Sequence, residues 1–203
     1  MRARSHPSLF DPPQDALFGA AAFDPKPTVA IRLPDVDRLD LGALAPAPGR
    51  TYKTLSLWQP WASLCVHPLE VYRKRYETRS WPCPSWLMGR EVAIHATKTL
   101  QREAREFVED AIDDGETFFT DAFDGLGLSL DELPLGAVLG VVRVVECLRM
   151  ERVNPTTQEV AFGDYEPGRY AWRLELVESF PEPIPARGAQ KIWDWEDPRS
   201  VAA

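Results

Sequence analysis

Three charged residues lie close together in the sequence at a spacing that could bind or transform a ligand. They are Lys74, Glu77 and Arg79, and the stretch 75–81 around them alternates as an extended strand does. Alternate residues of a strand share a face, so Arg75, Glu77 and Arg79 are expected on one side. The lysine is a point charge and the guanidinium a planar fork, so both could bind a phosphate or a base carbonyl. Glu77 could accept a hydrogen bond from an exocyclic amine such as that of cytosine.

The same three residues permit a catalytic alternative. Lys74 would act as a base on water or a ribose 2′-hydroxyl, Arg79 would stabilise developing negative charge, and Glu77 would orient the lysine. However, a carboxylate beside Lys74 favours the charged ammonium, which works against a base. A third reading is a plain ion pair that holds a strand edge. We rank binding above catalysis and keep the alternatives open.

Aromatic residues near this segment could stack on the bases of single-stranded RNA. Trp61, Trp81, Tyr170 and Trp172 all offer flat surfaces of this kind. Aromatic side chains are more often part of a core, so we expect only one or two of them to contact a ligand. Trp81, beside the charged residues, and Tyr170 are the preferred candidates.

Polar residues elsewhere could complete the same site. Lys98 follows a buried-looking strand and suits a pocket or phosphate contact. Gln59 and Gln190 could read a base edge, or could only tie loops together. His95 lies inside the strand before Lys98 and is expected to be a core histidine with satisfied hydrogen bonds.

The elements that must position these residues indicate an α+β fold. Alternating or continuously apolar runs predict strands, and the segments concerned are 53–58, 75–81, 91–96, 137–145 and 168–176. A short helix is expected at 61–66 and an amphipathic one at 100–114. The inward face of the longer helix is expected to consist of Leu100, Ala104, Phe107, Val108 and Ala111. Four to six strands with two inserted helices predict a small barrel.

Three connecting segments have weaker patterns. The acidic, glycine-broken stretch 113–132 predicts a turn or short helices, and residues 154–158 predict a polar loop. Residues 181–185, rich in proline, predict an extended connection to a final short segment with Trp193 and Trp195.

The first 50 residues have a different composition from the rest. They contain eight prolines and no sustained hydrophobic period, so we expect residues 1–50 to be an extended or disordered tail before a domain at 51–203. Residues 28–33 could form a short strand. Gln14, Leu17 and Phe18 resemble the short peptides that dock on the bacterial sliding clamp, which would make the chain an adaptor; the competing reading is a plain linker.

The charge of the chain is unevenly distributed. Its 31 acidic and 23 basic residues give a net charge of −8, which would repel a phosphate backbone if it were spread evenly. Residues 73–105 instead hold eight basic and three acidic residues, whereas 106–159 hold three basic and thirteen acidic ones. The sequence thus allows a locally positive site on a negative body, although these charges could also be ordinary solvated faces.

Several protein classes are disfavoured by composition. We find no apolar run long enough to span a membrane, and no apolar stretch follows the basic start, so neither a membrane span nor a secretion signal is expected. The three cysteines are widely spaced without a CxxC pair or clustered histidines, which predicts a reducing, cytoplasmic location, no metal and no cofactor.

Several motifs occur in an order that resembles the ASCH domain family. The matching stretches are 56–64, 74–81, 93–96, 135–140, 162–172 and 185–190. The resemblance implies a PUA-like β-barrel similar to RNA-binding modules, and a ligand that is RNA, another single-stranded nucleic acid or a modified nucleoside. Some members hydrolyse acetylated cytidine and others have been described as ribonucleases, so it also admits a metal-independent hydrolase.

The hallmark of that family is G-x-K-x-x-E-x-R. Its lysine, glutamate and arginine fall on Lys74, Glu77 and Arg79, but its glycine position is Tyr72, which suggests a remodelled loop. The amidohydrolases of the family carry threonine where Glu77 stands. Because a carboxylate does not replace a hydroxyl nucleophile, and Thr78 should point to the other face, that chemistry is doubtful here.

Overall fold

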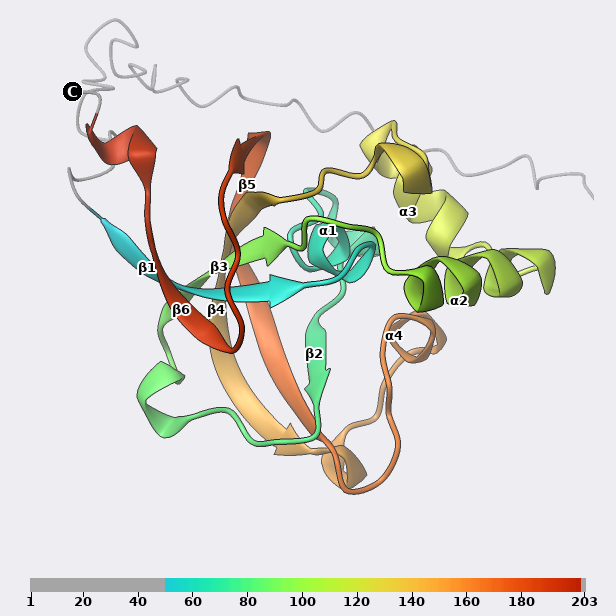
Figure 1. The fold of residues 1–203 in the computed structure, drawn as a ribbon. Coiled ribbons are helices and arrows are strands. Elements are labelled where there is room, and N and C mark those ends of the chain that lie inside the picture. Colours follow the sequence, from blue (N-terminus) through green and yellow to red (C-terminus); the bar gives the residue numbers. More distant parts are fainter. Residues whose placement is uncertain (1–49, 202–203) are drawn as a thin grey trace, which may run out of the picture. The chain divides into compact units, whose positions relative to one another are not determined.

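The computed structural model describes residues 50–201, which form a mixed α+β fold with six strands and four α-helices (Figure 1). The expected tail, the strand at 28–33 and the clamp-like peptide of Gln14, Leu17 and Phe18 lie outside the described residues. The strands are β1 (Thr51–Leu57), β2 (Tyr76–Arg79), β3 (Glu91–Ala96), β4 (Ala137–Arg149), β5 (Tyr170–Pro185) and β6 (Ile192–Glu196). The helices are α1 (Trp61–Cys65), α2 (Arg102–Asp113), α3 (Phe118–Leu126) and α4 (Thr157–Ala161).

The strands form one sheet in the order β2-β5-β4-β3-β1-β6. Only β1 and β3 pair in parallel, and the other neighbours are antiparallel. The long β4–β5 pair shifts register at three places, and such bulges increase the local bend and twist of a sheet. As Figure 1 shows, β4 and β5 curve, and β2 lies beside β5.

The expected elements are found, with four corrections. Strand β4 continues to Arg149, and β5 continues through the proline-rich segment that was expected to be a connection. Strand β2 is shorter than predicted. The polar stretch near 154–158 begins a short helix, α4, because the Thr156 side chain accepts a hydrogen bond from the Glu159 N–H (3.2 Å) and caps it.

Apolar side chains gather in three clusters. The largest lies on the sheet with α1, and a second joins α1, α2 and α3 through Leu64, Val108 and Phe119. A third lies at the β6 side around Trp195. Helix α2 buries Ala104 and Val108 as predicted, but Phe107 is 49% exposed. Phe107 lies on the same side of α2 as predicted, but its side chain is half exposed and is not buried in the core.

Helix α2 ends at Asp113, one residue before its predicted limit of 114. Gly115 has φ +91°, and the N–H groups of Gly115 and Glu116 donate to the carbonyls of Ile112 and Ala111. No helix of the described chain is both long and apolar enough to cross a membrane.

Candidate functional site

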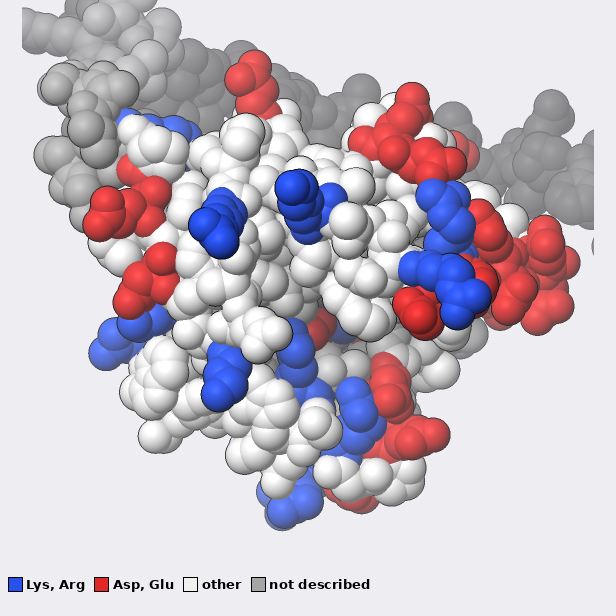
Figure 2. Space-filling model, viewed as in Figure 1, with Lys and Arg blue, Asp and Glu red and all other residues white. Residues whose placement is uncertain are grey.

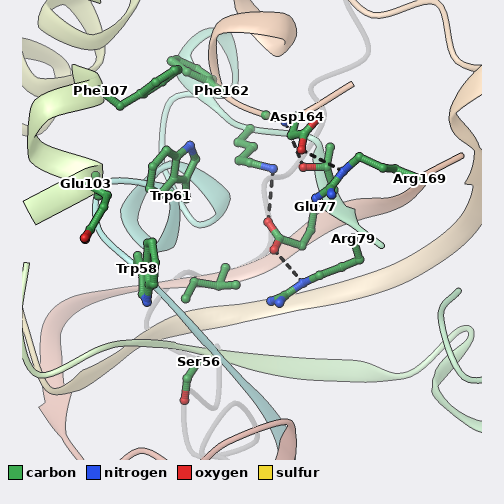
Figure 3. Close-up of a pocket in the computed structure, with 15 residues that line it drawn as sticks. Ser56, Trp58, Trp61, Glu77, Arg79, Glu103, Phe107, Phe162, Asp164 and Arg169 are labelled. Carbon is green, nitrogen blue, oxygen red and sulfur yellow. Dashed lines mark hydrogen bonds and ion pairs between the residues drawn. The ribbon is translucent and has the colours of Figure 1, made fainter. Parts of the chain in front are cut away.

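A cavity of about 600 Å³ lies between the β2 edge of the sheet and the helices (Figure 3). Its walls come from the end of β1, from α1, from the segment 74–79, from α2 and from the stretch after α4. The lining residues are Ser56, Leu57, Trp58, Trp61, Lys74, Glu77, Thr78, Arg79, Glu103, Ala104, Phe107, Phe162, Gly163, Asp164 and Arg169.

The three hallmark residues form a chain of ion pairs on one wall of the cavity. Lys74 Nζ donates to Glu77 Oε2 at 3.2 Å and to the Tyr76 carbonyl. Arg79 Nε lies 2.9 Å from the other oxygen, Glu77 Oε1. The Lys74 backbone N–H donates to the Leu64 carbonyl (3.0 Å), which fixes the start of this segment against α1. The structure thus brings together the three charged side chains that were singled out by their spacing in the sequence.

Burial distinguishes these linked ion pairs from an ion pair on the protein surface. The Lys74 side chain is 2% exposed, that of Glu77 is 9% exposed, and that of Arg79 is 26% exposed. Removing such charges from water is costly unless each is paired, and here Glu77 pairs with both cations. Arg79 is paired through Nε, and among the described residues no hydrogen bond or ion pair uses its terminal guanidinium nitrogens, so their donors remain available to a ligand.

A second arginine enters the cavity from the loop before β5. Arg169 Nε lies 3.1 Å from Asp164 Oδ2 (Figure 3). The Asp164 backbone N–H donates to Thr78 Oγ1 (3.1 Å), and Gly163 lets this loop approach the Thr78 methyl group closely. Thr78 therefore lines the cavity too, and its side chain packs against the loop of Gly163 and Asp164.

Aromatic side chains and one acid form the opposite wall. Trp58 and Phe107 are 46% and 49% exposed, and the Trp61 and Phe107 rings lie 6.1 Å apart. Glu103, on the same helix as Phe107, lies beside the tryptophans in Figure 3 and is exposed. Its carboxylate has no ion-pair or hydrogen-bond partner among the described residues, so it can accept from a ligand.

Two aromatic residues preferred from the sequence lie outside the cavity lining. Trp81 packs edge-on against Trp172, with ring centroids 4.7 Å apart, and its carbonyl accepts from the Trp172 indole. Tyr170 packs on the core and carries the Arg149 guanidinium 4.9 Å above its ring. Of the four aromatic candidates, only Trp61 lines the cavity; Trp172 is buried in the core, and Trp81 and Tyr170 are partly buried against it.

The other polar candidates also lie outside the lining. Gln59 is buried; its Nε2 donates to Ser63 Oγ (2.9 Å) and to the Pro134 carbonyl (2.7 Å), so it ties loops together. Lys98 and Gln190 are exposed, and neither belongs to the cavity wall. Arg75 also departs from its expected place, since its backbone and side chain meet Glu159 rather than the hallmark carboxylate.

His95 has the structural setting expected of it. Nε2 faces the Ala186 carbonyl and Nδ1 faces Ser56 Oγ, both at 3.2 Å. Burial lowers the pKa of this imidazole, which keeps it neutral at physiological pH. Of His95 and its two partners, only Ser56 lines the cavity. The Ser56 hydroxyl also donates to the Ala189 carbonyl.

Tyr72, in the place of the hallmark glycine, does not block the cavity. Its ring packs edge-on against His67 with centroids 5.4 Å apart, and it lies over Gly125 of α3. A Cβ at Gly125 would come within 2.8 Å of the tyrosine ring, so the glycine in α3 makes room for it. The loop is remodelled by packing Tyr72 against α3 and away from the cavity.

The described residues include no group of three or more His, Cys, Asp or Glu side chains that could hold a metal ion. Cys65, buried near Lys74, has its pKa raised to about 12 by burial, so it does not supply a thiolate at neutral pH.

The sequence reasoning missed Trp58, Glu103, Phe107, Asp164 and Arg169 as cavity residues. Trp58 stands next to Gln59 at the end of a predicted strand, where an exposed tryptophan could have been noted. Arg169 and Asp164 lie in the stretch 162–172 that contributes to the family resemblance, but nothing in that stretch singled out these two side chains.

No protein-family model matches the chain, and no curated protein is significantly similar to it in sequence.

Proposed function

We propose that the domain is an ASCH-type, PUA-like module that binds a nucleotide, in RNA or free, in the cavity built around Lys74, Glu77 and Arg79. The observation that carries the proposal is the position of these residues. The three residues of a K-x-x-E-x-R pattern form one buried ion-pair chain on a cavity whose opposite wall is aromatic. Cationic donors facing aromatic surfaces are the combination that single-stranded nucleic acids require.

The size and charge of the surroundings support this proposal. A cavity of about 600 Å³ lies within the range of small-molecule sites. In Figure 2, basic side chains are dotted across the middle of the face that carries the site, whereas most acidic ones lie toward its edges. A phosphate can therefore approach the site in spite of the net charge of −8.

Binding is favoured over catalysis by the state of Lys74. Its Nζ lies between the Glu77 carboxylate and the Tyr76 carbonyl and serves both as a hydrogen-bond donor, which is a positioning role in the ion-pair chain. A hydrolase acting on RNA or on an acylated nucleoside remains the alternative, and the same experiment tests it.

The test is binding of short fluorescent single-stranded RNA and of cytidine derivatives to the full chain, with ligand integrity followed by mass spectrometry. Arg79→Gln and the volume-matched Lys74→Met should each weaken affinity by about tenfold to a hundredfold, the usual loss for a charge-assisted hydrogen bond. Arg173→Gln is the matched control, because Arg173 lies on β5 outside the cavity with a half-exposed side chain.

Three results are informative. Tight binding of intact ligand that depends on Lys74 and Arg79 supports a reader. Turnover that disappears in Lys74→Met makes the protein a hydrolase. Absence of both binding and turnover at low salt, or equal losses in Arg173→Gln, overturns the proposed site.

A further inference from the structure

The two ends of the cavity differ in charge and in surface type. Arg79 and Arg169 lie together at one end in Figure 3, whereas Trp58, Trp61 and Glu103 lie at the other. A ligand that fills the cavity therefore meets cationic donors at one end, and aromatic faces with a carboxylate at the other.

The cationic end has more donors than its own acceptors use. Glu77 forms ion pairs with Lys74 and Arg79, and Asp164 forms one with Arg169. Three cations are therefore paired with only two carboxylates. The Nε–H groups of both arginines are buried and, within the described chain, make no aligned hydrogen bond, although each Nε lies close to a carboxylate. Two guanidinium forks with spare donors and one excess positive charge are suited to a phosphate dianion.

The opposite end has more acceptors than donors. Glu103 projects from α2 without a partner in the described residues, next to the exposed tryptophan of the cavity wall. A carboxylate at this place accepts hydrogen bonds and repels carbonyl oxygens. Stacking on Trp58 or Trp61 by itself tolerates any base, whereas the Glu103 carboxylate supplies a contact that can distinguish them.

We infer that the cavity holds a nucleoside monophosphate unit with an amino-bearing base. Its phosphate would lie on Arg79 and Arg169, and its base on the tryptophans with the amino edge toward Glu103. This inference rests on the proposed nucleotide-binding function and adds two specificity-determining residues, Arg169 and Glu103, that lie outside the K-x-x-E-x-R pattern.

The phosphate end is tested by competition of cytidine and cytidine monophosphate against fluorescent RNA on the full chain. Wild type should prefer the monophosphate by about tenfold or more, the effect expected of charge-assisted hydrogen bonds. Arg169→Gln should reduce that preference, with Arg173→Gln as the control. The ratio of the two affinities is the readout, because a variant that only loosens the Asp164 loop weakens both ligands equally.

The base end is tested with uridine monophosphate in the same assay. Wild type should prefer cytidine, adenosine and guanosine monophosphates over uridine monophosphate by about tenfold, as for a good base-edge contact. Glu103→Gln should remove most of the difference, since an amide can donate to the uracil carbonyl. Glu106→Gln, on the outer side of the same helix and paired with Arg102, should leave it unchanged.

The outcomes separate this inference from the proposed function. RNA binding that depends on Arg79, together with equal affinity for nucleoside and nucleotide, overturns the phosphate end only. Equal affinity for all four monophosphates overturns the role of Glu103 only. Failure of millimolar monophosphates to displace bound RNA overturns both roles, and failure of RNA itself to bind overturns the proposed function as well.

Discussion

Glu77 and Glu159 are both buried carboxylates in contact with the segment 74–79, but their partners differ. Glu77 is held by two side-chain cations, and it faces the cavity. Glu159, 2% exposed, accepts from the Arg75 backbone N–H (2.8 Å) and from the Tyr165 hydroxyl (3.1 Å), with Arg75 Nε at 3.4 Å. The arrangement around Glu77 leaves cationic donors for a ligand. Around Glu159 the donors are used by the carboxylate itself, which joins α4 to the start of β2.

The difference teaches that a buried carboxylate does not by itself mark a binding site. The pKa of Tyr165 is raised, mainly by burial and then by the Glu159 charge, so the phenol stays a proton donor to that carboxylate. Around Glu159 the donors and acceptors are matched, which is what a structural link requires. Around Glu77 the guanidinium of Arg79 retains donors that only a ligand or water can use.

The largest effect on stability is expected from Glu77→Ala. The substitution leaves the Lys74 ammonium buried with only a carbonyl as partner, so the unfolding free energy should fall by about 3–5 kcal/mol. Urea unfolding followed by tryptophan fluorescence measures it. The double variant Lys74→Met with Glu77→Leu should recover much of the loss while remaining unable to bind, because matched apolar residues remove the unpaired charge. A loss below about 1 kcal/mol in the single variant would show that Lys74 does not depend on Glu77.

A smaller loss is expected from Glu159→Gln. The amide oxygen can still accept from one donor, but its NH₂ group faces the other, so about 1–3 kcal/mol should be lost. Ligand affinity should stay within about twofold of wild type if Glu159 is only a structural link, provided it is measured where the variant is fully folded. A loss of affinity as large as that of Arg79→Gln would contradict the distinction between the two carboxylates.

The two buried histidines extend the comparison to pH. The Leu69 N–H donates to His67 Nδ1 (3.1 Å), and Nε2 donates to the Ala122 carbonyl (3.0 Å), so both nitrogens are satisfied in the neutral ring. Burial lowers the pKa of His67 and of His95 below the ordinary value of 6.5. The unfolded chain then binds more protons than the folded one, so stability should fall as pH drops below about 6.5.

Urea midpoints between pH 8 and pH 5 measure this fall, and NMR titration of the two imidazoles assigns it. Burial is the main cause that lowers the pKa of His67, and the charge of the nearby Arg73 adds to it. Stability that is constant or rises toward pH 5 would contradict the neutral, fully bonded state of both rings.

The regular elements could be predicted because their patterns are local. Strand β3 has the predicted limits, and α2 differs from its prediction by two residues at its start and one at its end. The depth of a side chain is not local. Phe107 lies on the apolar stripe of α2, and its periodicity gives a direction but does not tell a core from a cavity wall.

The candidate site could be predicted in part for the same reason. Lys74, Glu77 and Arg79 are near in sequence, so a short bend brings them together. Arg169 reaches the cavity only because β5 pairs with β2, and this pairing joins segments about 90 residues apart. The closeness of Trp81 to Arg79 in the sequence predicts a ligand contact, but Trp81 packs edge-on against Trp172 on the neighbouring strand and lies outside the cavity lining.

The smallest effect on stability is expected from Arg79→Gln, and it is the sharpest test of the comparison. Glu77 keeps Lys74 as a partner, and the Arg79 side chain is 26% exposed, so the unfolding free energy should change by less than about 1 kcal/mol. Affinity for RNA should fall at least tenfold, and the dependence of log K on log salt should become shallower by about one unit, because one phosphate contact is lost. If the variant loses stability but keeps its affinity, Arg79 has a structural role like that of Glu159 and does not contact the ligand. Loss of affinity at unchanged stability and a shallower salt slope together require the arginine to contact the ligand itself.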